Sequence, residues 1–180
     1  MLSIDGTPFV IKGDWDTTPD PPNSIVIKLP PVDHRFVYGF GWNPSTQGML
    51  RALERLDVKG KVVLDVGTGT GILAIAAAKM GAKVYAVDTD KDALDYAKEV
   101  ATLNGVDILF ETPDHADVVL ANLGDVQWVL DCLNFSGTMV ATIPETSLIP
   151  LEAHMRGWTV QNDLVGQGSD RFAVLTLRRP

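Results

Sequence analysis

The residues of this chain best placed to do chemistry lie at the ends of two apolar runs. They are an acid, three glycines and a second acid. The first run, Val62–Val66, contains Asp65 and leads into the glycine-rich segment 67–71, and the second run, Val84–Val87, ends at Asp88. A strand, a glycine turn, a helix and a strand that ends in an acid form a site for an adenosine-containing cofactor, in which the acid accepts hydrogen bonds from the ribose. The expected cofactor contacts here are Gly67, Thr68, Gly69, Gly71 and Asp88.

Asp65 favours one adenosine cofactor over another. A carboxylate two residues before the first glycine would repel a pyrophosphate and would suit a ligand with ammonium and sulfonium charges. This favours S-adenosylmethionine over NAD, with Asp65 among the cofactor-binding residues. The segment 69–74 also satisfies the dinucleotide spacing G-x-G-x-x-A, so NAD stays an alternative. A third reading is a tight turn that needs glycine for its backbone angles and binds nothing.

Composition limits the classes of partner. The chain has 180 residues, enough for one core, and its 15 basic and 23 acidic residues give a net charge of -8, which disfavours nucleic acid. Cys132 is the only cysteine, and His34, His115 and His154 stand apart, so we expect no disulfide and no metal site. The N-terminal residues lack a basic start and a long apolar stretch. We therefore expect no signal peptide, no membrane span and a cytoplasmic location.

Residues 1–42 differ from the remainder of the chain. Two short strands, Phe9–Lys12 and Ser24–Leu29, flank a run of turn-forming residues. We expect them to form a β-hairpin or an extended arm that packs on a main domain of residues 43–180. Asn43 and Pro44 then open a helix, as its N-cap and first helical residue.

Strands and helices alternate regularly from residue 61 onward. This order predicts an α/β fold with a doubly wound, mostly parallel, seven-stranded Rossmann-like sheet, whose ligand crevice lies at the carboxyl ends of the strands. Two final strands should form a hairpin through the segment 166–168, with one of them antiparallel to the rest of the sheet. The predicted strands are Val62–Val66, Lys83–Val87, Asp107–Phe110, Asp117–Ala121, Thr138–Ile143, Trp158–Gln161 and Phe172–Leu177; the helices after the first are Ile72–Met80 and Lys91–Leu103.

Three segments of the chain, residues 39–46, 64–76 and 117–123, carry motifs in a fixed order. Together they resemble those of a known family, the bacterial ribosomal-protein methyltransferases called PrmA, which are class I S-adenosylmethionine-dependent enzymes. Gly39-Phe40-Gly41-Trp42-Asn43-Pro44-Ser45-Thr46 is similar to the family's F-G-T-G-x-H-P-T-T segment. Residues 64–76 are very close to its glycine-loop motif, and residues 117–123 resemble its D-V-V-x-A-N-I/L strand. Trp15 and the strand that follows it are similar to the linker before the family's methyltransferase domain.

The resemblance implies functional roles for four residues. It places Thr46, Gly67, Asp88 and Asn122 on the cofactor, and it places Asn122 also at the border of the methyl-acceptor pocket, which makes Asn122 the candidate catalytic residue. The alternative for Thr46 is a neighbour of the helix cap, and the alternative for Asn122 is a turn residue. Trp42 either stacks on a substrate or fixes the arm to the domain.

The resemblance implies methyl transfer from S-adenosylmethionine to a nitrogen of a protein, either a lysine or an N-terminal amine. The alternatives are a small-molecule amine as the acceptor, and a non-catalytic module that binds the cofactor. Asn43 stands where the family has His, and we expect the chain to lack the family's N-terminal substrate-docking domain, since few residues precede Trp15. Asp125 is expected to cap a helix, with proton acceptance as its alternative role.

Overall fold

A computed structural model describes residues 1–30, 39–122, 137–147, 150, 153, 154, 156–166 and 171–179. Cys132, His34 and Asp125 lie outside these described residues. The helices are α1 (Pro44–Glu54), α2 (Ile72–Lys79) and α3 (Lys91–Asn104). The strands are β1 (Leu2–Ser3), β2 (Phe9–Gly13), β3 (Ile25–Leu29), β4 (Val62–Val66), β5 (Lys83–Val87), β6 (Ile108–Leu109), β7 (Val118–Ala121), β8 (Gly137–Pro144), β9 (Thr159–Val165) and β10 (Phe172–Arg179).

The larger sheet has seven strands in the order β6-β5-β4-β7-β8-β10-β9. The strands β6, β5, β4, β7 and β8 pair in parallel, and β10 is antiparallel to both of its neighbours. This confirms the predicted α/β fold class and the antiparallel strand near the C-terminus. The inner strands β5, β4, β7, β8 and β10 contain buried apolar residues, as expected where a sheet is covered on both faces, whereas the edge strands β6 and β9 have none.

The helix α1 begins as the sequence predicts. Asn43 is extended and its side-chain oxygen accepts a hydrogen bond from the Ser45 amide at 2.9 Å, and Pro44 is the first helical residue. Gly48 lets this helix lie close to the sheet, because a Cβ at this position would be 2.7 Å from Cγ2 of Val174 in β10. The N-terminus of α1 is therefore held at a fixed place beside the larger sheet.

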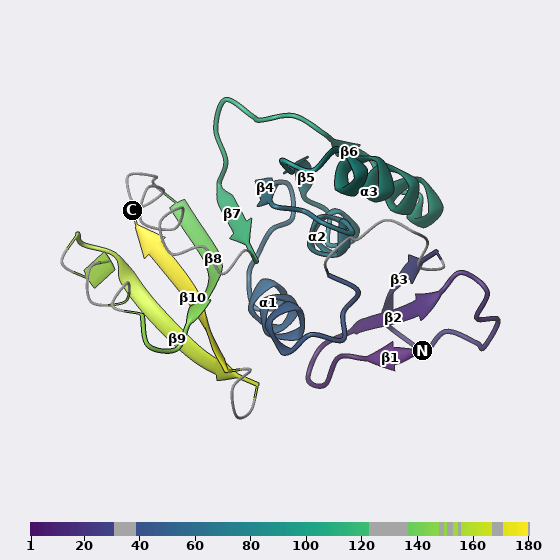
Figure 1. Cartoon of the computed structure of the whole chain (residues 1–180), viewed down its shortest axis with the longest axis horizontal. Helices are drawn as coiled ribbons and strands as arrows, with labels where there is room; N and C mark the ends of the chain where they lie inside the picture. Colours follow the sequence, from purple (N-terminus) through teal and green to yellow (C-terminus); the bar gives the residue numbers. More distant parts are fainter. Residues whose placement is uncertain are drawn as a thin grey trace.

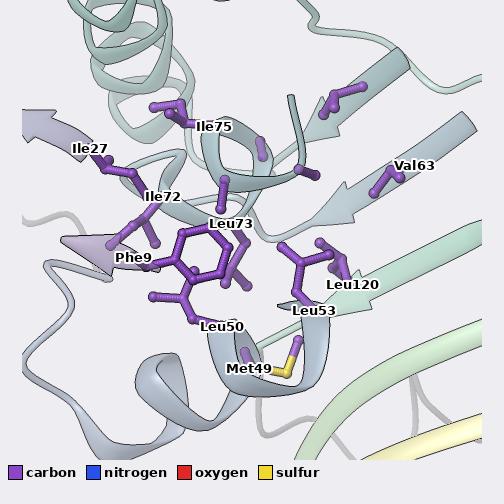
Figure 2. Close-up of a cluster of buried hydrophobic side chains, with 14 of the residues drawn as sticks. Phe9, Ile27, Met49, Leu50, Leu53, Val63, Ile72, Leu73, Ile75 and Leu120 are labelled. Atoms are coloured by element: carbon purple, nitrogen blue, oxygen red, sulfur yellow. The ribbon is translucent and has the colours of Figure 1, made fainter. Parts of the chain in front are cut away.

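One apolar core joins the helices to both sheets. Figure 2 shows Phe9 of β2 among Leu50 of α1 and Ile72 and Leu73 of α2, while Leu53 lies beside Leu120 of β7. Each of these side chains is almost fully buried. In Figure 1 the strands β1 to β3 lie on the side of α1 that faces away from β8 and β10, and β3 contacts α2 and α3. The N-terminal strands thus add a layer over the helices.

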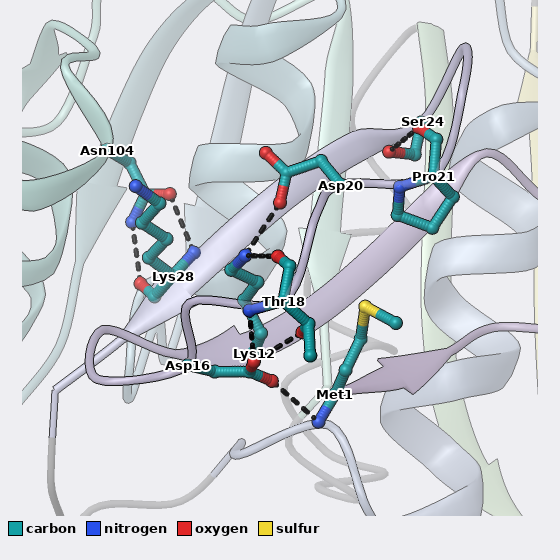
Figure 3. Close-up of polar contacts among 9 residues, drawn as sticks. All are labelled: Met1, Lys12, Asp16, Thr18, Asp20, Pro21, Ser24, Lys28 and Asn104. Atoms are coloured by element: carbon teal, nitrogen blue, oxygen red, sulfur yellow. Dashed lines mark hydrogen bonds and ion pairs between the residues drawn. The ribbon is translucent and has the colours of Figure 1, made fainter.

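Two forms were predicted for the N-terminal strands, a β-hairpin or an extended arm, and the β-hairpin is wrong. Phe9 of β2 lies opposite Ile25 of β3 and the two strands run parallel, while the short β1 pairs antiparallel with β2. Parallel strands need a crossover connection, which residues 14–24 provide. Lys12 holds this connection, since its ammonium donates to the Thr18 carbonyl at 2.9 Å and to Asp20 at 2.7 Å (Figure 3).

Asn104, at the end of α3, ties the arm to the main domain. Its side-chain oxygen accepts from the backbone N–H of Lys28 at 2.8 Å, and its side-chain nitrogen donates to the Lys28 carbonyl at 2.7 Å (Figure 3). The amide thus continues the hydrogen-bonding pattern at the open edge of β3. The division of the chain at residue 42 stays a prediction.

Leu53 tests the contribution of the shared core. Its side chain is 0% exposed, whereas Leu103, also on a helix, is 38% exposed. We expect Leu53→Ala to lower the free energy of unfolding by about 2–5 kcal/mol, because it removes apolar contacts and leaves a cavity. The control Leu103→Ala should cost less than about 1 kcal/mol. Urea unfolding followed by circular dichroism measures both, and equal losses would contradict the described core.

Candidate cofactor-binding crevice

The ends of three neighbouring strands bring the main candidate residues together. Val66 of β4 lies opposite Val87 of β5 on one side and Ala121 of β7 on the other. The residues that directly follow these partners are Gly67, Asp88 and Asn122. All three are half-buried, so each keeps some surface open to a ligand. A crevice at the carboxyl ends of parallel strands is the usual ligand site of this fold.

The glycine loop is fastened to the end of β5. The backbone N–H groups of Gly67 and Thr68 both donate to the Val87 carbonyl, at 2.9 and 3.1 Å. Gly67, Gly69 and Gly71 have φ angles of 66°, 54° and 80°, in the left-handed region that favours glycine. At Gly71 an added Cβ would also be 3.3 Å from Cβ of Ala97, so glycine lets the loop approach α3 closely.

Asp65 lies beneath this loop rather than at its surface. Its side chain is 1% exposed, and one of its oxygens accepts hydrogen bonds from the Thr68 hydroxyl at 2.7 Å and the Ala74 N–H at 3.2 Å. Ala74 is in the first turn of α2, so Asp65 caps that helix from a strand, a role that the sequence analysis missed. Burial raises the pKa of Asp65 to about 7, against the lowering effect of the Thr68 and Ala74 hydrogen bonds. The charge of Asp88 raises the pKa further.

Asp88 is held in place while it keeps capacity for a ligand. One carboxylate oxygen accepts from the Gly69 N–H at 2.9 Å, and the other accepts from the Asp90 N–H at 3.0 Å. A carboxylate oxygen can accept two hydrogen bonds, so each oxygen retains one acceptor position. These two positions fit a pair of ribose hydroxyls.

Asn122 belongs to a chain of hydrogen bonds between three elements. Its side-chain nitrogen donates to the Thr46 hydroxyl in α1 at 3.0 Å, and its side-chain oxygen accepts from the Thr142 hydroxyl in β8 at 3.0 Å. Thr46 and Thr142 are buried. The arrangement fixes the orientation of the Asn122 amide at the end of β7.

The predicted site residues therefore divide by exposure. Gly67, Asp88 and Asn122 are half-buried at the crevice. The other five are buried: Thr46, Asp65, Thr68, Gly69 and Gly71. Direct cofactor contact stays a prediction for all eight. Thr142 was missed because a threonine inside a strand is ordinary in sequence. Its place opposite Val174 and its hydrogen bond to Asn122 depend on the pairing of β8.

The segment before α1 contacts the glycine loop and α3. The Gly39 carbonyl accepts from the Thr70 hydroxyl of the glycine loop at 2.6 Å, and Phe40 makes an edge-on contact with Tyr96 of α3, with ring centroids 5.9 Å apart. Trp42 is 67% exposed, so the fold buries only a minor part of its surface, and its role in fixing the arm to the domain stays a prediction. The alternative of stacking on a substrate stays a prediction.

Within the part of the chain that the structure describes, no helix is long and apolar enough to cross a bilayer. Over the same described residues, no three His, Cys, Asp or Glu side chains lie together as a metal would require.

A Rossmann-like sheet with a glycine loop, an acid and an amide at adjacent strand ends defines a domain of the methyltransferase fold class. The model of the family described as "Ribosomal protein L11 methyltransferase (PrmA)" matches residues 5–126, which is more than half of the chain. The chain belongs to this family.

Individual relatives agree with the family match. The chain is 42% identical over 125 residues to a ribosomal protein L11 methyltransferase of Geobacter metallireducens, covering 66% of this chain and 40% of that protein. It is 36% identical over 152 residues to one from Enterobacter sp. strain 638, covering 79% and 47%. The chain thus spans less than half the length of these curated relatives.

Solved structures show the same fold. The crystal structure of a ribosomal protein L11 methylase from Lactobacillus delbrueckii subsp. bulgaricus matches with a TM-score of 0.78 and 26% identity, over 99% of this chain and 98% of that one. Magnesium protoporphyrin IX methyltransferase from Synechocystis PCC 6803, solved with bound SAM, matches with a TM-score of 0.59 over 74% of this chain and 76% of that one. At 15% identity, the second match shows the fold alone.

The raised pKa of Asp65 predicts a specific dependence of stability on pH. Because the folded-state pKa is about 7 and the ordinary value is 3.8, the folded protein binds the proton more tightly than the unfolded chain does. The contribution of Asp65 to stability is complete below about pH 4 and is lost as the pH rises to about 7. We expect the stability of the wild type relative to Asp65→Asn to fall over this range, by at most about 1.4 kcal/mol per pH unit.

Urea unfolding of both proteins at several pH values between 4 and 8 measures this difference. The control Asp114→Asn changes an exposed acid and should show no such relative loss. A stability difference between wild type and Asp65→Asn that is constant across the range would contradict the raised pKa.

Proposed function

We propose that this protein is an S-adenosylmethionine-dependent methyltransferase that acts on a nitrogen of a protein, either a lysine or an N-terminal amine. The observation that carries the proposal is the meeting of Gly67, Asp88 and Asn122 at the ends of three adjacent parallel strands. Membership of a methyltransferase family supports the same reaction. The names of the relatives indicate that their methyl acceptor is a ribosomal protein, L11. We infer that the methyl acceptor of this chain is also a protein.

The residues of the crevice fit the cofactor. Asp88 has two acceptor positions for ribose hydroxyls, and the half-buried Gly67 has no side chain to obstruct the backbone at the mouth of the loop. Asp65 supplies negative charge below the loop when it is ionised, which favours a ligand with ammonium and sulfonium groups over a pyrophosphate. S-adenosylmethionine would supply the activated methyl group.

The protein's own contribution is positioning. Methyl transfer from a sulfonium is an in-line displacement, which needs an aligned nucleophile and an active site closed to water more than it needs an acid or a base. Asn122 has an amide whose orientation is fixed by Thr46 and Thr142 at the end of β7, and we assign to it the orientation of the acceptor nitrogen. A lysine has an ordinary pKa of about 10.4, so it must lose its proton before it attacks, through desolvation and the positive charge of the cofactor.

Binding of nucleotides by the purified chain tests the choice of cofactor. We expect S-adenosylmethionine and S-adenosylhomocysteine, but not NAD, to raise the melting temperature.

Asp88→Ala should weaken the binding of S-adenosylmethionine at least tenfold in calorimetry, because hydrogen bonds to a charged acceptor contribute about 1.5–3 kcal/mol each. Asp114→Ala serves as the exposed-acid control. Stabilisation by NAD alone would overturn the proposed cofactor, and unchanged affinity in Asp88→Ala would overturn the ribose assignment.

Asn122 tests the proposed acceptor side. Asn122→Ala should reduce turnover more than it reduces cofactor affinity, because a fixed amide that orients the nucleophile acts in the transition state. The assay follows transfer of a labelled methyl group into proteins of a cell lysate, with cofactor affinity measured separately. Thr142→Val is a matched comparison that removes the hydrogen bond to the Asn122 oxygen but keeps the amide, and it should cause a smaller loss.

Equal losses of turnover and cofactor affinity in Asn122→Ala would make Asn122 a cofactor contact only. Cofactor binding without methyl incorporation into any protein would favour a small-molecule acceptor or a non-catalytic binding module.

A further inference from the structure

A cavity lies between the N-terminal arm and the segment before α1. Its volume is about 570 Å³, within the range of ligand pockets in proteins. Ile11, Leu29 and Phe40 form an apolar part of its lining, and the indole rings of Trp15 and Trp42 also line it. These residues come from two segments that are separated in sequence, so the cavity exists only when the arm is packed on the domain.

Both tryptophans are unusually accessible for residues of their size. Trp15 is 66% exposed and Trp42 is 67% exposed, whereas Trp158 is 2% exposed. Trp15 lies over Gly13, where an added Cβ would be 2.5 Å from the indole ring, so the glycine makes room for this position of the ring. Exposed tryptophans that line one cavity indicate a binding surface, since large aromatic side chains are usually buried in a folded protein.

Acids neutralise the two cationic groups that line the cavity, so neither group repels a cationic occupant. Lys12 is paired with Asp20 at 2.7 Å, and the amino group of Met1 is paired with Asp16 at 3.1 Å (Figure 3). Hydrogen bonds from the Thr18 side chain and backbone lower the pKa of Asp16 to about 2, so this carboxylate is ionised at neutral pH. The chain as a whole carries a net charge of -8. Indole faces attract cations, and a long cationic side chain can also lay its aliphatic stem on apolar residues.

The cavity is connected to the cofactor crevice by a short segment. Gly39 is hydrogen-bonded to Thr70 of the glycine loop, and Phe40 and Trp42, which follow it in sequence, line the cavity. Asn43 then caps α1, which contains Thr46, the partner of Asn122. The short segment 39–42 thus joins the glycine loop to the cavity.

We propose that this cavity binds a basic segment of the protein acceptor, with a lysine or arginine side chain against the indole rings of Trp15 and Trp42. The inference rests on the proposed function, because it assigns a docking site for the acceptor of that reaction. It adds a contact outside the crevice, so it predicts that recognition of the acceptor and binding of the cofactor depend on different residues.

Binding of short labelled peptides tests the proposal without any cofactor. Fluorescence anisotropy compares fluorescein-labelled hexalysine, hexaglutamate and an uncharged peptide of alternating leucine and serine, at about 0.15 M salt. We expect hexalysine to bind best. Trp15→Ala and Trp42→Ala should each weaken its binding about two- to fivefold, as the loss of an exposed cation–π contact implies. Trp15→Phe and Trp42→Phe should restore part of the affinity.

The controls separate the cavity from the acidic surface. The tryptophan variants keep the net charge, so attraction to the surface in general is the same in all of them. Leu164→Ala changes a side chain that is 53% exposed on β9, and it should bind hexalysine like the wild type. Thermal unfolding checks that each variant is folded.

Two results would overturn the docking site: hexalysine that binds equally to the wild type and to both Trp→Ala variants, or an uncharged peptide that binds as well as hexalysine. If either occurs while S-adenosylmethionine still binds, the proposed function stands and only the docking site fails. If the cofactor does not bind but hexalysine binding depends on the tryptophans, the docking surface stands and the proposed function fails.

Discussion

The burial of Asp65 under the glycine loop is the constraint on which the rest of the site depends. Its carboxyl group connects the end of β4 to Thr68 in the loop and to Ala74 in the first turn of α2. The loop is fastened from the other side by hydrogen bonds to Val87 and Asp88 of the neighbouring strand. A buried carboxyl group is costly unless it is hydrogen-bonded, so the loop and the helix are held in the one arrangement that satisfies it.

Hydrogen bonds also fix Asn122 at the end of β7. The Asn122 amide uses both of its polar atoms to connect α1 and β8, so the residue that we assign to orientation of the nucleophile is itself oriented by two elements. A side chain whose two polar atoms are already hydrogen-bonded loses little conformational entropy when a substrate binds. This small entropy loss is the physical reason for our proposal that Asn122, which also contributes to the fold, orients the nucleophile.

The N-terminal strands contribute both to the core and to a surface. Phe9 joins the core between α1 and α2, and Asn104 closes the edge of β3 with two hydrogen bonds to Lys28. Packed in this way, the arm and the segment with Phe40 and Trp42 form the lining of a cavity. The arm is thus fixed to the domain by apolar packing on one side and presents exposed aromatic side chains on another.

Patterns that repeat over a few residues were sufficient to predict the seven strands, the cap at Asn43 and the glycine loop, because hydrophobic periodicity and turn chemistry are local properties. The ends of β4, β5 and β7 followed from the rule for parallel sheets, and they placed Gly67, Asp88 and Asn122 together. The parallel pairing of β2 with β3, the capping role of Asp65 and the contact of Thr142 with Asn122 were decided only by the tertiary structure. Each of these depends on which distant segments meet, and no spacing along the chain records that.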